Sequence, residues 1–133
     1  MAASAMAASR IKNPGLAAQI EGELTWLRYV SPITEHYCRQ IAQRDYRGKR
    51  LAYWGHITVQ NIIPMLALKQ AGAEIAVGAC NTDSTNDAAA AYLVSKGIRV
   101  YGWQGMSQLE YQENLALVRS FEVTAQPDGT ARG

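Results

Sequence analysis

Short apolar segments alternate with segments of helical length three times along this chain, and that alternation constrains the fold more than any other feature. Strands that alternate with helices of 10–15 residues are typical of right-handed crossovers, which build a parallel sheet. We therefore expect three neighbouring parallel strands with helices on both faces, a three-layer α/β fold. The expected strands are 50–54, 74–79 and 98–103, and the helices that follow them are 58–70, 86–95 and 107–121.

Two amphipathic helices are expected before the first strand. Apolar residues recur at helical spacing from Leu16 to Leu27. Ser31 and Pro32 then stop this helix and start another, whose apolar stripe includes Ile33 and Tyr37. With these two helices in front of it, the parallel sheet predicts a Rossmann-like architecture.

The chain is expected to form one domain. Its 133 residues suffice for a single core, with a flexible leader over 1–12, the α/β domain over 13–123 and a mobile tail over 124–133. A net charge of +2 from scattered basic residues does not favour nucleic acid, and no apolar run is long enough for a membrane span. Cys38 and Cys80 have no metal-ligand spacing and are interpreted as reduced, buried thiols, so a cytoplasmic location is expected.

Five large apolar side chains are assigned to the core from pattern alone. Trp26, Trp54 and Trp103 are interpreted as core residues rather than as a stacking platform for bases. In the last helix, Leu109 and Val118 are expected to face inward.

A glycine and a histidine follow the first expected strand. Gly55 allows a close approach of the backbone, and His56 stands at the carboxyl end of the strand, the edge where ligands bind in open parallel sheets. Thr58 and Gln60 add a hydroxyl and an amide to the start of the next helix. The alternative is an ordinary turn with a solvated imidazole.

The loop after the second strand is almost entirely polar over residues 80–87. Asn81, Ser84 and Thr85 have the groups to bind a zwitterionic or hydroxylated ligand. The alternative is helix capping, because such residues before an alanine run make a good helix N-terminus. No three residues with metal-ligand spacing stand near this loop, so no metal site is predicted.

Several motifs in order resemble the S-adenosyl-L-homocysteine hydrolase family. Residues 55–61, GHITVQN, are similar to the family's LHMT(I/V)(Q/E)T, and residues 72–75, GAEI, to its GAEV. Residues 80–87, CNTDSTND, resemble CN-x-x-STQD, and residues 97–105, GIRVYGWQG, resemble GI-x-V-(F/Y)-x-W-(K/Q)-G. The resemblance runs without gaps from 48 to 105 and covers the family's substrate-binding domain.

The resemblance implies a role for each candidate residue. His56 would be catalytic, near the ribose and leaving group of S-adenosylhomocysteine, and Thr58 and Gln60 would read the adenine edge. The polar loop would lie towards the homocysteine tail. The full set implied by the resemblance is Gly55, His56, Thr58, Gln60, Asn81, Ser84 and Thr85.

Three departures from the family pattern qualify these roles. Gly55 replaces a leucine that forms an apolar wall of the adenine pocket, and Asn86 and Ala88 differ from the loop motif. The chain also ends at Gly133, about where the family continues into its catalytic lysine and aspartate and its NAD domain. We expect a substrate-binding fragment that is inactive alone, with adenosine or S-adenosylhomocysteine as ligand. The NAD domain would come from the rest of a longer chain or from a partner, and a second copy is another partner left open. The rival hypothesis is a free-standing, non-catalytic module for adenosine binding or oligomerisation.

Overall fold

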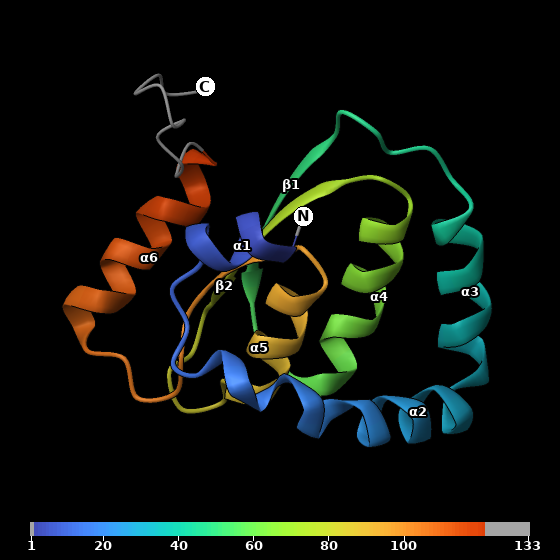
Figure 1. Ribbon diagram of the computed structural model, residues 1–133, viewed down its shortest axis with the longest axis horizontal. Helices are drawn as coiled ribbons and strands as arrows, with labels where there is room; N and C mark the ends of the chain where they lie inside the picture. Colours follow the sequence, from blue (N-terminus) through green and yellow to red (C-terminus); the bar gives the residue numbers. More distant parts are fainter. Residues whose placement is uncertain (1, 122–133) are drawn as a thin grey trace.

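A parallel three-stranded sheet forms the centre of the protein, which the computed structural model describes for residues 2–121 (Figure 1). The strands are β1 (Arg50–Gly55), β2 (Glu74–Ala79) and β3 (Arg99–Tyr101), and they lie in the order β1-β2-β3. In this register Gly55 pairs with Ala79, and Gly78 pairs with Tyr101. The predicted parallel pairing of neighbouring strands is therefore confirmed.

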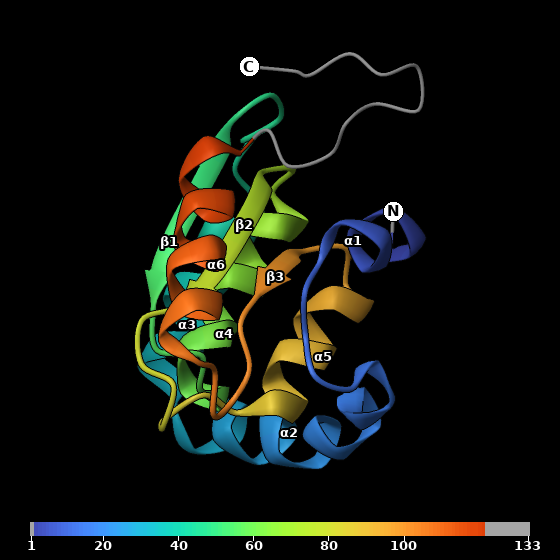
Figure 2. The ribbon, with the colours of Figure 1, turned by 90° about the vertical axis from the view of Figure 1, so that its left-hand side faces the viewer.

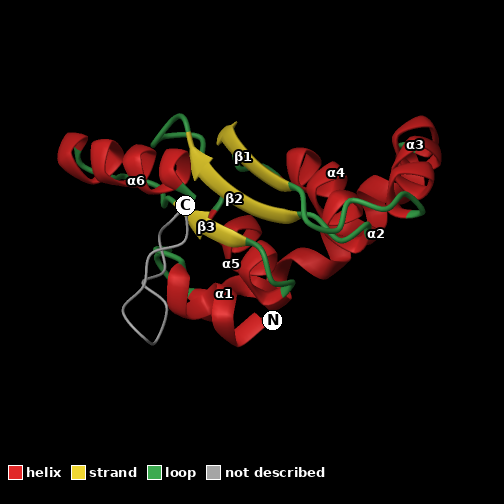
Figure 3. Ribbon diagram, turned by 90° about the horizontal axis from the view of Figure 1, so that it is seen from above, coloured by secondary structure: helices red, strands yellow, loops and turns green. Residues whose placement is uncertain are grey.

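Helices cover both faces of the sheet, as Figures 2 and 3 show. Helices α4 (Val59–Gln70) and α5 (Asp87–Ser95) connect the strands and pack together on one face. Helix α6 (Gln108–Ser120) packs against all three strands on the other face. These three layers confirm the predicted Rossmann-like α/β class.

The alternation of side chains along β2 explains how both faces are filled. Ile75 and Val77 are buried in the larger core beneath α4 and α5, whereas Ala76 packs in a smaller cluster under α6. Gly78 points to the α6 face, where an added Cβ would collide with the Trp54 ring and lie 2.8 Å from Val118 Cγ2. A side chain at this position would therefore separate α6 from the sheet.

The first residues of the chain differ from the expected flexible leader. Residues Ala2–Ala8 form helix α1, which packs against α5 and β3. The following segment extends beside β3, because the Arg10 N–H donates to the Val100 carbonyl at 2.8 Å and the Gly102 N–H to the Arg10 carbonyl at 3.0 Å. Alanine has the highest helix propensity, and the docking of α1 outweighs the absence of an amphipathic pattern.

The helices before the sheet are confirmed, with a division that the pattern did not predict. A 3-10 helix, η1 (Pro14–Ile20), leads directly into α2 (Glu21–Val30), and α3 (Pro32–Ala42) follows after Ser31. Figure 1 shows α2 and α3 meeting at a corner of the molecule.

Two residues assigned to the core and two residues of an expected apolar stripe are exposed instead. On α3 the small Cys38 is buried facing α4, so Ile33 and Tyr37 lie on the outer side of the helix. Trp26 is also exposed, as is Leu109 on α6. Helical spacing alone was insufficient, because α2 and α3 each carry two apolar stripes and only one of them can face the core.

The tail expected over residues 124–133 lies outside the described residues. Within residues 2–121, no helix has both the length and the apolar character needed to cross a membrane.

Candidate functional site

The loops that follow β1 and β2 are joined by backbone hydrogen bonds. The Cys80 N–H donates to the Gly55 carbonyl at 3.0 Å, and the Asn86 N–H donates to the Ile57 carbonyl at 2.9 Å. These bonds continue the pairing of the strands beyond their ends. The polar residues of the two loops are therefore held on one edge of the sheet, the carboxyl edge, as parallel strands require.

The loop after β3 is attached to the same group. The Gly105 N–H donates to the Thr82 carbonyl at 3.0 Å, and the Gln104 N–H donates to Asp87 Oδ1 at 2.9 Å. Asp87 stands in the first turn of α5, and its carboxylate thus holds the third loop against the second. All three loops form one connected rim.

His56 lies on this rim with its ring exposed to solvent. Its Nδ1 is 2.7 Å from Ser84 Oγ, so side chains from the first two loops meet directly. Its backbone carbonyl accepts a hydrogen bond from Asn61 Nδ2 at 3.0 Å, which fixes the turn. A serine hydroxyl both donates and accepts, so this contact supports either neutral tautomer of the imidazole. In one tautomer Nε2 carries a proton to donate, and in the other it offers a lone pair.

Thr58 and Gln60 follow His56 at the start of α4 and differ in availability. Thr58 is the N-cap, and its Oγ1 accepts from the Asn61 N–H at 3.4 Å, a long contact that leaves the hydroxyl proton to find another acceptor. Gln60 lies in the first turn with an exposed side chain. The amide of Gln60 is therefore the freer of the two groups.

The second loop uses most of its polar groups internally. Asn81 Oδ1 accepts from the Asp83 N–H at 2.7 Å, and Thr85 Oγ1 donates to the Asn81 carbonyl at 2.8 Å. Thr85 is only 4% exposed, and the Asn86 side chain caps α5 through the Ala89 N–H. The capping interpretation therefore describes Asn86, while Ser84 and Asn81 remain exposed on the rim.

Tyr53 occupies the space beside Gly55 and was missed by the sequence analysis. A Cβ on Gly55 would collide with the Tyr53 ring, whose Cε1 atom would be 2.8 Å away. Tyr53 and Gly55 are two residues apart on one strand and so face the same side of the sheet. Burial, and secondarily the nearby Cys80, raise the pKa of the Tyr53 hydroxyl. An aromatic ring thus fills the place that a leucine side chain would take.

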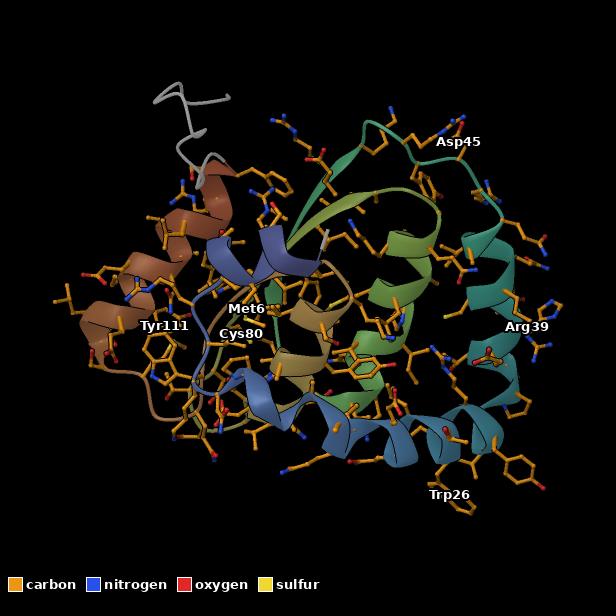
Figure 4. The ribbon with its side chains drawn as sticks, viewed as in Figure 1. Met6, Trp26, Arg39, Asp45, Cys80 and Tyr111 are labelled. Atoms are coloured by element: carbon orange, nitrogen blue, oxygen red, sulfur yellow. The ribbon has the colours of Figure 1, made fainter. Side chains whose placement is uncertain are left out.

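Tyr111 connects the rim to α6 and was also missed. The Trp54 indole N–H donates to the Tyr111 hydroxyl at 3.3 Å, and that hydroxyl donates to the Cys80 carbonyl at 3.2 Å. The Trp54 and Tyr111 rings meet edge to face with centroids 5.3 Å apart. Figure 4 shows Tyr111 projecting from α6 in the direction of Cys80. This network holds the ends of β1 and β2 from below the rim.

The described residues contain no cluster of three or more His, Cys, Asp or Glu side chains that could hold a metal ion. Cys38 is a buried free thiol, whereas Cys80 is partly exposed and differs in this from its expected burial. The fold places the chain in the class of open α/β proteins, in which ligands bind at the carboxyl edge of the sheet.

Comparison with known proteins identifies the family within this class. The model of the S-adenosyl-L-homocysteine hydrolase family matches residues 31–129, and the chain belongs to that family. It is 32% identical over 114 residues to an adenosylhomocysteinase of Sulfolobus acidocaldarius, covering 85% of this chain and 28% of that protein. An adenosylhomocysteinase of Pyrobaculum aerophilum is 32% identical over 127 residues, covering 95% of this chain and 29% of the relative.

A relative that is named for a different substrate matches about equally well. An S-inosyl-L-homocysteine hydrolase of Methanothermobacter thermautotrophicus is 31% identical over 114 residues, which is 85% of this chain and 27% of that protein. The chain spans less than a third of the length of each of these three relatives.

Proposed function

We propose that this chain is the substrate-binding domain of an adenosylhomocysteinase-like protein and binds the nucleoside part of S-adenosylhomocysteine on the carboxyl edge of its sheet. The observation that carries the proposal is the contact of 2.7 Å between His56 Nδ1 and Ser84 Oγ. It brings together side chains from two loops that the family motifs independently select. Both side chains are exposed, so a ligand can reach them.

His56 is the residue that we assign to the chemistry. With Nδ1 held by Ser84, Nε2 is left to donate to or accept from a ribose hydroxyl or the leaving group. Because the serine supports both tautomers, the imidazole can release a proton at Nε2 in one step and take one up in another. Ser84 acts on this reaction by orienting the ring.

Gln60 is the residue that we assign to the base. Its amide has a donor and an acceptor end, and rotation of the amide presents either end to the ligand. It can therefore accept from the 6-amino group of adenine or donate to the 6-oxo group of hypoxanthine. Since relatives named for both substrates match this chain equally well, we propose that Gln60 alone discriminates weakly between adenosine and inosine.

NAD enters the proposal only through the family resemblance; in a complete family enzyme it would supply the oxidation of the ribose. The strand-to-helix turns of this chain are GHIT, CNTDSTN and GWQGMS, none of which is the Gly-rich fingerprint that cradles a dinucleotide. The residues present do not fit NAD. We derive no step through it and expect the isolated chain to bind its ligand without hydrolysing it.

The test is a titration of the 133-residue chain with adenosine, inosine and S-adenosylhomocysteine, followed by NMR. We expect affinities around millimolar, about −4 kcal/mol, with the first shifts at the amides of His56, Thr58 and Gln60. His56→Ala should weaken binding about 3- to 10-fold, the value of one hydrogen bond, and change stability by no more than about 0.5 kcal/mol. His36→Ala is the matched control, because His36 is the other histidine and lies exposed on α3.

Two results would contradict this proposal. Shifts confined to α6 would move the site from the carboxyl edge to the face of the sheet that α6 covers. A large loss of stability in His56→Ala with unchanged binding would make the imidazole a structural group. The rival, a module that has lost nucleoside binding and serves only association, predicts no saturable shifts with any of the three ligands.

A further inference from the structure

A pocket lined by basic and aromatic side chains lies beside β3, apart from the residues assigned to the nucleoside. We call it the Arg10 pocket. It has a volume of about 350 Å³ and is lined by Arg10, Ile11, Lys12, Trp103, Gln104 and Gly105. This volume is within the range of small-molecule sites. Because it shares no lining residue with the candidate nucleoside site, the Arg10 pocket is a separate place for a ligand.

The two basic side chains come from a segment whose backbone is fixed at both ends. The Arg10 N–H and carbonyl are both hydrogen-bonded to the β3 segment, at 2.8 and 3.0 Å. At the other end Asn13 Oδ1 accepts from the Gly15 N–H at 2.9 Å, where η1 begins. Figure 2 shows the chain between α1 and the next helix running beside β3. Arg10 and Lys12 are thus held on the same pocket without any change of the backbone.

The charge of the Arg10 pocket is positive. Lys12 is exposed and forms no ion pair within residues 2–121. Arg10 Nη1 is 3.2 Å from Glu113 Oε2, but the two side chains are 38% and 47% exposed, and ion pairs of this kind are weak. The contact with Glu113 leaves the Nε and Nη2 donors of Arg10 to a ligand. None of the described lining residues is acidic, so two cations face a space that an anion can enter.

Trp103 gives the pocket an aromatic wall. Its indole ring packs partly against the main core, and the Arg10 guanidinium carbon lies 5.7 Å from the ring centroid. The expected place of Trp103 in the core therefore holds for only a part of its side chain, and the rest lines the pocket. The contact between the cation and the ring keeps the guanidinium in place before a ligand arrives.

The charge and shape of the Arg10 pocket favour a phosphate monoester as its ligand. At neutral pH this group carries a charge of about −1.5 to −2, which matches the two cations, whereas a carboxylate carries a single charge. A guanidinium binds two phosphate oxygens at once, and an ammonium adds a compact charge. Ile11 and Trp103 remain to contact the organic part of the molecule.

We propose that the Arg10 pocket binds a small molecule that carries a phosphate monoester. The phosphate lies between Arg10 and Lys12, and the organic part packs against Trp103. This site does not depend on nucleoside binding at the rim. The two sites report through different residues, so failure of one proposal is distinguishable from failure of the other.

The test is an NMR titration of the 133-residue chain with phenyl phosphate, at an ionic strength held constant with chloride. We expect saturable shifts at the amides of Arg10 and Lys12 and at the indole N–H of Trp103, with a Kd around millimolar. Phenyl sulfate has the same shape but only one charge, and it should bind at least about 5-fold more weakly. Inorganic phosphate lacks the ring and should bind at least about 3-fold more weakly.

Three variants separate the pocket from the general charge of the chain. Lys12→Gln should raise the Kd of phenyl phosphate by about 5-fold or more, with an unchanged melting temperature because Lys12 has no ion pair to lose. Lys49→Gln is the matched control, because Lys49 is also exposed but precedes β1 at the amino edge of the sheet, and the Kd should stay within about twofold. Glu113→Gln keeps an oxygen for Arg10 and removes the competing charge, so it should lower the Kd about twofold or more.

Several results would overturn the proposal. One is the absence of saturable shifts at Arg10, Lys12 and Trp103 up to about 20 mM phenyl phosphate. Equal affinities for phenyl phosphate and phenyl sulfate would show only a general attraction of anions. An equal loss of affinity in Lys49→Gln, or no loss in Lys12→Gln, would assign the binding to the net charge of the chain and not to this pocket.

Discussion

The space beside Gly55 offers the sharpest test of how this chain departs from its family. The perturbation is Gly55→Ala, and then Gly55→Leu, the residue of the family motif. The first added carbon already collides with the Tyr53 ring, and a leucine adds three more in the same direction. Tyr53 is partly buried against the main core, so it cannot move without losing contacts. Forcing extra atoms into an occupied site costs about 1–3 kcal/mol.

The expected size of the effect is measurable by thermal unfolding. A loss of about 2 kcal/mol lowers the Tm of a domain of this size by roughly 6–10 °C. Gly22→Ala is the matched control, because its added carbon meets nothing and removes a helix glycine, which stabilises by up to about 1 kcal/mol. Gly55→Ala should thus lower the free energy of unfolding, whereas Gly22→Ala should raise it. Adding Tyr53→Ala to Gly55→Leu should recover about 1–2 kcal/mol relative to the sum of the single changes. Single changes that add within about 0.5 kcal/mol would refute the idea that the ring has taken the place of the leucine.

The remaining predictions concern Tyr101 on β3 and Tyr111 on α6. The Tyr101 hydroxyl is buried without a hydrogen-bond partner, so Tyr101→Phe should raise the stability measured in urea by about 1 kcal/mol. Burial raises the pKa of the Tyr101 hydroxyl, an effect that Arg99 partly opposes. The hydroxyl therefore loses its proton at a lower pH in the unfolded chain than in the folded protein. As the pH rises above about 10, the wild-type protein should lose stability more steeply than Tyr101→Phe. An identical alkaline decline would contradict this account. Tyr111→Phe should lower the free energy of unfolding by about 1–2 kcal/mol, because it leaves the Trp54 N–H and the Cys80 carbonyl unpaired. Unchanged stability in the same unfolding curves would show that the network does not support the rim.

The strands and their order could be predicted because burial on both faces leaves little choice. A run such as 74–79, apolar at nearly every position, must lie in the middle of a parallel sheet. The structure gives the same bounds to β2 and shortens the expected third strand to Arg99–Tyr101. Local composition thus indicates that a strand forms, whereas the residue at which it ends depends on how far the neighbouring strand continues beside it.

The helices before the sheet show where local patterns fail. Ile33 and Tyr37 stand at helical spacing on α3, and this spacing assigns them to the apolar stripe that should face the core. The helix instead turns Cys38 towards α4, where it is buried, and leaves Ile33 and Tyr37 exposed. Which of its two apolar stripes a helix buries depends on the shape of the element that it packs against. The pattern of a single sequence does not give that shape.

The loop residues of the candidate site could be predicted from the sequence, but the aromatic ring that lies beside Gly55 could not. His56 and Ser84 were both selected from motifs, and their contact follows from parallel strands that end at one edge. Tyr53 was not selected, because its ring matters only through the missing side chain of Gly55. The sequence shows that a side chain is missing at Gly55, but only the structure shows that the Tyr53 ring lies in its place.

The topology gives a physical reason why binding at this edge should be weak in the isolated chain. Helices α4 and α5 cover one face and α6 the other, so the chain reverses its winding after β3. In an open α/β sheet such a reversal places the ligand crevice beside the first strand, between it and a strand added on its outer side. The segment that contains Arg10 protects the β3 edge, but among residues 2–121 no strand pairs with the outer edge of β1. The loop that carries His56 therefore has a neighbour on the β2 side only. A nucleoside bound there keeps much of its surface in water, and the millimolar affinity that we predict follows from this half-open geometry rather than from poor chemistry at His56.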